Sequence, residues 1–368
     1  MGLLGLSGCG SPSSASVEMS SQTELVKTGS MELQYAENFA VDYYEDGYKM
    51  LITLPDSKRY LLVPEGQPVP GGLDEDVSIL QEPLQNIYLV ASGVMDMFAS
   101  VDAVDQIRFS GQKQENWYIQ TAKDAMAAGD MIYAGKYSKP DYELLVSEGC
   151  DLAIENRMIT HSPEVVEMLQ SFDIPVMIEY SSYEQHPLGK VEWVKFFGTL
   201  TGKEAEAEEA FAEQTEILEK VESGEKTGKT IAFFYVTSNG LIQVRQSTDY
   251  IPKLIELAGG RYIFEDLEDS GSGRSTLNMQ VEDFYAGAKD ADILIYNSSI
   301  DGGVTTLDEL IGKCNILKDF KAVQEGQVYC TTNDMYQQSM AIGYLLQDMH
   351  TVLTDDDTAK LRYLFLLQ

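Results

Sequence analysis

The chain has 368 residues, and 59 acidic against 26 basic residues give it a formal net charge of −33. This balance argues against nucleic acid as a partner, because contact with phosphates requires a basic surface. Apolar residues make up 44% of the chain, which is enough for packed cores, and the length suits two domains better than one.

The first predicted element is a processing signal. Leu6-Ser7-Gly8-Cys9, followed by a serine-rich run to Ser21, resembles the lipobox at which a bacterial secretory signal is cut and the new N-terminal cysteine is lipidated. The apolar run before it covers only residues 3–6, whereas a full signal has ~7–15 apolar residues, so we expect its upstream half to be missing. Cys9 is therefore predicted to anchor an extracytoplasmic protein by lipid; the alternative is an ordinary cysteine in a disordered start.

A tether and a small sheet are expected next. Residues 10–30 are rich in Ser and Thr and lack apolar periodicity, which predicts a flexible tether. Residues 39–63 alternate in a strand-like way around a turn at Asp46-Gly47, which predicts a small antiparallel β decoration. A Pro- and Gly-rich loop follows at residues 64–72.

The rest of the chain predicts an α/β fold built from two series of alternating strands and helices. Such alternation implies parallel sheets that are covered by helices on both faces. In the first series the strands are expected at residues 87–91, 151–154 and 174–178, with a helix at 163–172. In the second they are expected at 230–236, 291–296 and 328–329, with helices that end at Gly259-Gly260 and at residue 353.

One long polar helix is predicted between the two series. Thr201-Gly-Lys-Glu204 has the spacing of a capping box, and a narrow apolar stripe continues from Ala207 to Val221. We expect this helix to join two lobes stiffly, so that they move little against one another. The predicted organisation is a signal with lipobox (1–9), the tether (10–30), an N-terminal α/β lobe with its β decoration (31–200), the interlobe helix (201–223) and a C-terminal α/β lobe (224–368).

Three segments together resemble a known family. They are Gly135-Lys-Tyr-Ser-Lys-Pro-Asp-Tyr-Glu143, the helix from Asp249 to Gly260, and Gln280-Val-Glu282 leading into a strand. Over roughly residues 85–355 the chain resembles the iron-complex and cobalamin class of ABC-transporter substrate-binding proteins, the class III periplasmic binding proteins. The resemblance implies two Rossmann-like lobes with a ligand cleft between them, and delivery of a metal complex to an ABC permease and its ATPase. The strands at 39–63 depart from the minimal family pattern.

Two carboxylates match family positions that dock the lobes onto arginines of the permease. Glu143 and Glu282 each lie at the start of a helix that leads into a strand headed by an aspartate, Asp151 in one half and Asp292 in the other. Two widely separated charges would fix the orientation of the complex and steer the encounter. The alternative is that each glutamate merely complements the dipole of its own helix.

Candidate metal ligands follow two strands of the first lobe. Ligands of open α/β sheets bind beyond the carboxyl ends of the strands, where His161, Glu184 and His186 are expected. Histidine and glutamate are competent ligands for a divalent or ferric ion, held directly or through a chelator. The alternative is that the two histidines cap or bond turns.

The remaining ligand candidates are aromatic or cationic. Aromatic rings at a cleft could stack on a catechol, tetrapyrrole or corrin ring, and an arginine could pair with an anionic chelate. Trp117 is equally plausible as a core or lobe-packing residue. The alternative for Arg245 is a solvated position on the surface. The residues predicted to bind the ligand are Trp117, Tyr118, Arg157, Tyr183, Arg245, Tyr296 and Tyr336.

No catalytic motif competes with a binding function. The chain has no GxSxG elbow, no P-loop and no GxGxxG opening a helix after a strand. We therefore expect a monomeric, lipid-anchored receptor without enzymatic activity or intrinsic cofactor. Its ligand would be an iron-containing chelate, a ferric siderophore first and haem or a corrinoid next. The alternatives are a bare-cation receptor and a chelatase-like enzyme on a nitrogenase-like two-lobed fold.

Overall fold

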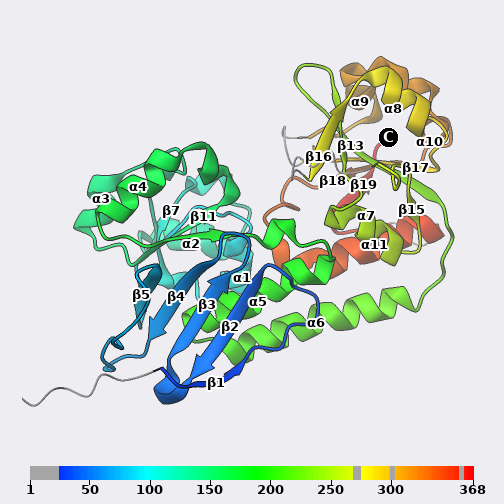
Figure 1. Ribbon diagram of the computed structural model, residues 1–368. Coiled ribbons are helices and arrows are strands. Elements are labelled where there is room, and N and C mark those ends of the chain that lie inside the picture. Colours follow the sequence, from blue (N-terminus) through cyan, green and yellow to red (C-terminus); the bar gives the residue numbers. More distant parts are fainter. Residues whose placement is uncertain (1–24, 268–274, 299–302, 356–359) are drawn as a thin grey trace, which may run out of the picture.

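The computed structural model describes residues 25–267, 275–298, 303–355 and 360–368, so that the predicted lipobox with Cys9 lies outside the described residues. Two α/β lobes stand next to each other, and a separate five-stranded sheet lies beside the first of them (Figure 1). None of the helices in the described ranges is long and apolar enough to cross a bilayer.

The first lobe is built on a sheet of five parallel strands, which confirms the α/β pattern predicted for this half. Alternate residues of β11 enter the two apolar clusters on opposite faces, Ile154 with α1 and Ala153 with α3 and α4. The strands, in spatial order, are β12 (Val176–Glu179), β11 (Leu152–Asn156), β6 (Ile87–Leu89), β7 (Ile107–Ser110) and β8 (Ile132–Tyr133). The helices are α1 (Val94–Ser100), α2 (Gln120–Ala128), α3 (Tyr142–Ser147) and α4 (Pro163–Ser171).

The sheet of the second lobe is mixed, and here the expectation of an all-parallel sheet is wrong. A tight turn at residues 237–241, closed by the Thr237 N–H to the Leu241 carbonyl at 2.9 Å, returns the chain antiparallel to β13. The strands are β13 (Thr230–Val236), β14 (Ile242–Arg245), β15 (Arg261–Tyr262), β16 (Thr276–Met279), β17 (Ile293–Tyr296), β18 (Val328–Thr331) and β19 (Leu364–Leu366), of which β13, β15, β17 and β18 pair in parallel. The helices are α7 (Tyr250–Leu257), α8 (Val281–Ala288), α9 (Leu307–Lys313), α10 (Lys321–Gln324) and α11 (Ile342–Thr354).

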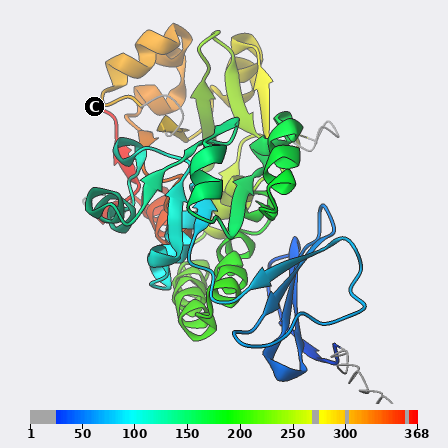
Figure 2. The same cartoon turned by 90° about the vertical axis from the view of Figure 1, so that its left-hand side faces the viewer.

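The N-terminal sheet is larger than predicted and projects from the body of the first lobe (Figure 2). It contains the strands expected within residues 39–63, and β1 lies in the segment predicted as tether, so that part of the tether prediction is wrong. Residues 64–76 cross one face of the sheet and cover Leu61 and Val63, which makes β5 parallel to β4. The strands are β1 (Lys27–Ser30), β2 (Phe39–Tyr44), β3 (Lys49–Thr53), β4 (Lys58–Val63) and β5 (Val77–Gln81).

Two buried carboxylates hold the segment that connects β1 to β2. Glu192 is fully buried and accepts the backbone N–H groups of residues 34–36 at distances between 2.8 and 3.1 Å. Glu184 accepts the N–H groups of Glu37 at 2.9 Å and Asn38 at 3.0 Å. Five successive backbone donors are thus satisfied by two charged acceptors, which make stronger hydrogen bonds than neutral ones. We call residues 34–38 the connecting segment.

The helix expected at residues 201–223 is present as α6 (Glu204–Glu222), and its predicted apolar stripe is buried. It follows the almost wholly buried α5 (Pro187–Thr201), packs on α5 and α11, and runs below both lobes (Figure 1). The predicted capping box is wrong. Gly202 adopts φ +70° and ends α5, so the Thr201 hydroxyl donates to the Phe197 carbonyl within α5 at 2.8 Å instead of capping α6.

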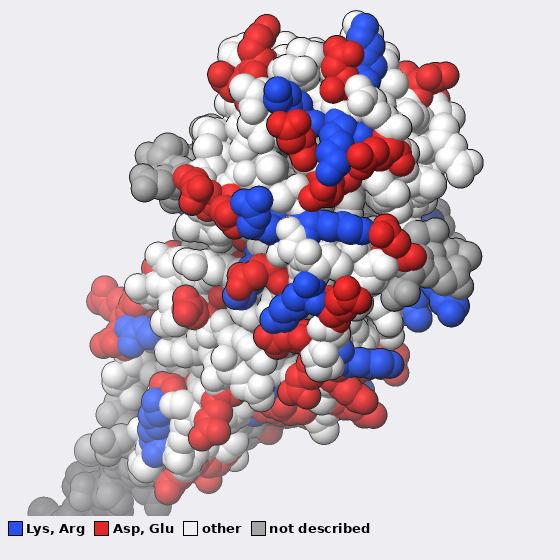
Figure 3. Space-filling model, turned by 90° about the vertical axis from the view of Figure 1, so that its right-hand side faces the viewer, with Lys and Arg blue, Asp and Glu red and all other residues white. Residues whose placement is uncertain are grey.

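Acidic and basic side chains share the surface. On the face shown in Figure 3, Lys and Arg are interspersed among Asp and Glu despite the large net negative charge. The excess of acidic residues therefore does not form one continuous field on this face, and interspersed charges of this kind mainly favour solubility.

Replacement of Glu192 by alanine should destabilise the protein through the connecting segment. Removing the carboxylate leaves backbone donors of residues 34–36 without their acceptor in a buried place, so we expect the free energy of unfolding to fall by about 2–4 kcal/mol. Urea unfolding measures this loss, and hydrogen exchange should show it first at residues 34–36. Glu209→Ala, on the exposed face of α6, is the control, and an equal effect of both variants would contradict the prediction.

Candidate functional site

The two lobes contact each other through the segment that follows β18. Gln337 is fully buried, and its Oε1 accepts the Tyr118 N–H at 2.7 Å while its Nε2 donates to the Asn116 carbonyl at 2.8 Å. On α1, the Asp96 carboxylate accepts the Met340 N–H at 2.7 Å. Burial raises the pKa of Asp96 to about 6. These hydrogen bonds tie the second lobe directly to the first.

Two predicted ligand residues from different lobes meet at this contact. Tyr118 and Tyr336 pack edge to face, with their ring centroids 6.4 Å apart. Their side chains remain 43% and 37% exposed, and the Tyr336 hydroxyl accepts a hydrogen bond from Gln337 at 3.0 Å. The structure therefore brings together two accessible aromatic rings at the contact between the lobes.

A second predicted pair lies at the carboxyl ends of β11 and β12. Arg157 begins the short helix η4 (Arg157–His161), and its guanidinium lies 4.6 Å from the ring centroid of Tyr183 in η5 (Ser181–Tyr183). Tyr183 is 39% exposed. A cation stacked on an accessible ring is suited to an aromatic or anionic ligand.

Arg245 is placed differently from the prediction. Its guanidinium lies 3.4 Å from the carboxylate of Asp249 and 5.7 Å from the ring centroid of Phe233. Asp249 in turn caps α7 by accepting the Ile251 N–H at 2.9 Å. Arg245 is thus neither a solvated surface residue nor an unpaired cation, and its main observed role is to balance a buried carboxylate.

Trp117 and Tyr296 are core residues, and their prediction as ligand contacts is wrong. Both side chains are fully buried. The Trp117 indole donates to the Ser110 hydroxyl at 3.0 Å, and Tyr296 packs against Phe234 at a centroid distance of 5.6 Å. Large aromatic residues near strand ends are drawn into the cores because they bury the most apolar area.

The three predicted metal ligands do not form a cluster. Glu184 is buried and spends its oxygens on the connecting segment and on the Trp193 indole at 2.9 Å. His186 accepts the Leu188 N–H at 3.2 Å and stacks on Tyr35 at 4.4 Å, as in the turn-capping alternative, whereas His161 lies exposed at the end of η4. Within the described ranges no group of three or more His, Cys, Asp or Glu side chains is arranged to hold a metal ion.

A recess of about 300 Å³ lies between the lobes on the side of His186. Burial, and secondarily the neighbouring Lys253, lower the pKa of His186. Tyr35 and Glu37 of the connecting segment line this recess, and nothing in their sequence context pointed to it. The other lining residues are Gln185, Ser247, Thr248 and Asp249, in addition to His186 and Lys253.

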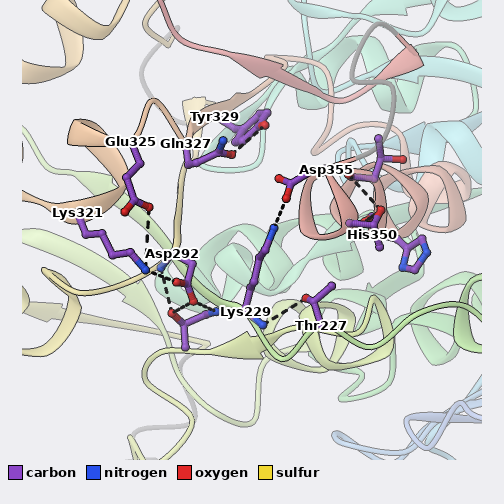
Figure 4. A network of polar contacts seen from close by, with 12 residues as sticks. Thr227, Lys229, Asp292, Lys321, Glu325, Gln327, Tyr329, His350 and Asp355 are labelled. Carbon is purple, nitrogen blue, oxygen red and sulfur yellow. Dashed lines mark hydrogen bonds and ion pairs between the residues drawn. The ribbon is translucent and has the colours of Figure 1, made fainter.

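The docking candidates lie on separate lobes. Glu143 is exposed in the first turn of α3, and Glu282 is exposed in the first turn of α8, at opposite outer edges of the molecule in Figure 1. The aspartates that follow are structural. Asp151 accepts the Asn86 N–H at 2.9 Å. Asp292 accepts the Thr230 N–H at 2.7 Å and pairs with Lys321 at 2.6 Å (Figure 4).

Glu155 is an unusual buried acid at the carboxyl end of β11. It is fully buried, and neither carboxyl oxygen has a hydrogen-bond partner among the described residues. Burial raises its pKa from 4.5 to about 8. Burial disfavours the charged form of this side chain, because no hydrogen bond from a described residue compensates the lost hydration.

The comparisons with known proteins agree with this architecture. The family model described as periplasmic binding protein matches residues 90–335. An uncharacterised lipoprotein of Methanocaldococcus jannaschii is 25% identical over 354 residues, which cover 87% of this chain and 81% of that protein.

Solved structures show the same fold at low sequence identity. A possible iron-binding, periplasmic solute-binding protein of Staphylococcus epidermidis aligns with a TM-score of 0.57 at 17% identity, over 73% of this chain and 98% of its own. A periplasmic heme-binding protein of Vibrio cholerae aligns with a TM-score of 0.58 at 14% identity, again over 73% and 98% of the two chains. Both likenesses support the two-lobed α/β fold.

Replacement of Glu155 by glutamine should change the pH dependence of stability. At low pH both folded and unfolded states hold the proton. As the pH rises from 4.5 to about 8, only the unfolded chain loses it, so the wild type should lose up to a few kcal/mol relative to the variant. Urea unfolding at pH 5, 7 and 9 measures the difference (roughly the range in which the linkage operates). Exposed Glu167→Gln on α4 is the control; parallel pH profiles of wild type and Glu155→Gln would refute the assignment.

Proposed function

The chain belongs to the periplasmic binding protein family, and we propose that it is a lipid-anchored extracytoplasmic receptor that captures a metal chelate between its lobes and delivers it to an ABC permease. The observation that carries the proposal is the meeting of Tyr118 and Tyr336 at the contact of the lobes. Two accessible rings held together at the contact of the lobes offer an aromatic surface on which an aromatic or macrocyclic ligand could stack.

A ferric siderophore is the ligand that we propose first, with haem or a corrinoid next. Arg157 stacked on Tyr183 supplies a planar cation beside a ring, which suits the anionic oxygens of a catecholate or carboxylate. The iron would be cargo, and its ligands would come from the chelator. Related folds in the possible iron-binding protein of Staphylococcus epidermidis and the periplasmic heme-binding protein of Vibrio cholerae support this choice of ligand class.

The proposal also covers how the protein is anchored to the membrane and how it docks onto the permease. We propose that Cys9 carries the lipid, in line with the lipoprotein of Methanocaldococcus jannaschii to which the chain is similar. We propose further that Glu143 and Glu282 dock the lobes onto the permease. Both side chains are exposed and lie on different lobes, so a permease that binds both glutamates would contact both lobes at once.

Titration of the purified protein with a panel of ligands tests the binding function. We expect a ferric siderophore to quench tryptophan fluorescence with a Kd of about 1 μM or below (about −8 kcal/mol). Tyr118→Ala and Tyr336→Ala should each weaken it about tenfold, because each loses a ring contact. Tyr133→Ala, 40% exposed at the edge strand β8, is the control. Tight binding of free iron, manganese or zinc alone would favour a bare-cation receptor, and no binding by any member of the panel would refute the proposal.

Charge reversal at both docking positions should abolish transport without loss of ligand affinity. Glu143→Arg combined with Glu282→Arg places repulsive charges against the proposed arginines of the permease, and like charges at an interface strongly oppose association. Uptake by cells and affinity of the purified variant are measured side by side. Glu167→Arg with Asp319→Arg makes the same charge change at other exposed positions of the two lobes. Normal uptake by the docking double variant would remove the assignment.

A further inference from the structure

A buried lysine stands where the two lobes meet. Lys190 lies in the first turn of α5 and is only 7% exposed. This helix contacts α7 of the second lobe and the short helix η8 (Ser339–Ala341) in the segment that ties the lobes together. Lysine is almost never buried to this extent unless it is paired, so its partners decide its role.

The ammonium of Lys190 has no oxygen partner among the described residues. Its Nζ lies 4.8 Å from the ring centroid of Tyr250, at the start of α7. A cation over an aromatic ring recovers part of the lost hydration but satisfies none of the three N–H donors as an oxygen would. An oxygen acceptor on a ligand could therefore form a hydrogen bond with the ammonium that no described residue supplies.

Three carboxylates interact electrostatically with the Lys190 ammonium, but each makes its hydrogen bonds with other groups. Burial raises the pKa values of Asp96, Glu179 and Asp249, and Lys190 partly offsets the rise in each. Asp96 accepts the Met340 N–H, and Glu179 accepts both the N–H and the hydroxyl of Ser181, at 2.8 and 2.6 Å. Asp249 is held by Arg245 and by the N-terminus of α7.

The second lobe offers another unsatisfied group next to the same contact. The Ser339 hydroxyl in η8 is buried and has no hydrogen-bond partner among the described residues. Ser339 directly precedes Met340, which donates to Asp96, and η8 contacts both α1 and α5. Polar groups without a hydrogen-bond partner among the described residues thus come from both lobes where α5 meets η8.

We propose that Lys190 receives an anionic oxygen of the bound chelate, and that the receptor therefore prefers negatively charged chelates to neutral ones. This inference rests on the proposed function and names the charge class of its ligand. A carboxylate or catecholate oxygen would give Lys190 the charge-assisted hydrogen bond that no described residue supplies. Because Lys190 is only 7% exposed, solvent screens this pairing less than it would screen a pairing at an exposed lysine.

Two ferric complexes of different charge test the inference, an anionic ferric catecholate and a neutral ferric hydroxamate. We expect wild type to bind the anionic complex more tightly, and Lys190→Gln to weaken that binding at least tenfold (about 1.4 kcal/mol) while it changes the affinity for the neutral complex less than about twofold. Lys318→Gln, at an exposed position of the second lobe, should change neither affinity. Equal loss for both complexes, or no loss for the anionic one, would overturn the role of Lys190.

A measurement of thermal stability distinguishes a ligand-binding role of Lys190 from a purely structural one. Lys190→Met leaves Asp96, Glu179 and Asp249 without the cation that partly offsets the rise in their pKa values, so the midpoint of thermal unfolding of the ligand-free protein should fall slightly. Addition of the anionic complex should raise the midpoint of wild type but not that of the variant. An equal rise of both midpoints on addition of the anionic complex would overturn the inference. Failure of wild type to bind any chelate would instead refute the proposed function itself, on which this step depends.

Discussion

The hydrogen bonds from the connecting segment to the carboxylates of Glu184 and Glu192 are the interaction on which the position of the N-terminal sheet depends. A chain that passes from β1 to β2 without a strand partner exposes backbone donors, and here five successive donors are satisfied by two buried carboxylates. Because both acids lie at or just before α5, the N-terminal sheet is fixed to the helix that reaches the contact between the lobes. The sheet is therefore an integral part of the binding fold, and Tyr35 lines the interlobe recess as a direct consequence.

The position of α5 explains why this helix is buried on all sides. Its aromatic residues pack against Phe39 of the N-terminal sheet, its first turn meets α7, and α6 returns along it. A helix with so many partners cannot shift without disturbing several elements at once, because packed interiors deform little. The packing of α5 and the hydrogen bonds of Gln337 and Asp96 across the lobes both favour lobes that move little against each other. This stiffness stays a prediction. Selection of the ligand would then rest on side chains more than on closure of the lobes.

Elements whose residues have one dominant preference could be predicted from the sequence. The run at 230–236 is the strand β13, and the closing helix begins at Ile342, because apolar periodicity leaves few alternatives there. What failed depended on distant partners. Trp117 lies in the core of the first lobe. Glu184 binds a segment about 150 residues away in the chain, which no local pattern could pair with it. The Thr201 hydroxyl donates within α5, the helix that ends at Gly202, instead of capping the next helix. Gln337 and Lys190 gave no signal at all, since their importance comes only from the meeting of the lobes.

The large negative charge of the chain bears directly on how it would choose an anionic chelate. At physiological ionic strength exposed charges are screened beyond ~8 Å, so the net charge of −33 repels an approaching anion only weakly and near the surface. It gives no attraction either, and steering by the whole molecule cannot account for preference. A recessed ammonium is screened far less than an exposed one. The discrimination must therefore arise at short range, after the ligand has entered, from a cation that the fold holds at the contact between the lobes.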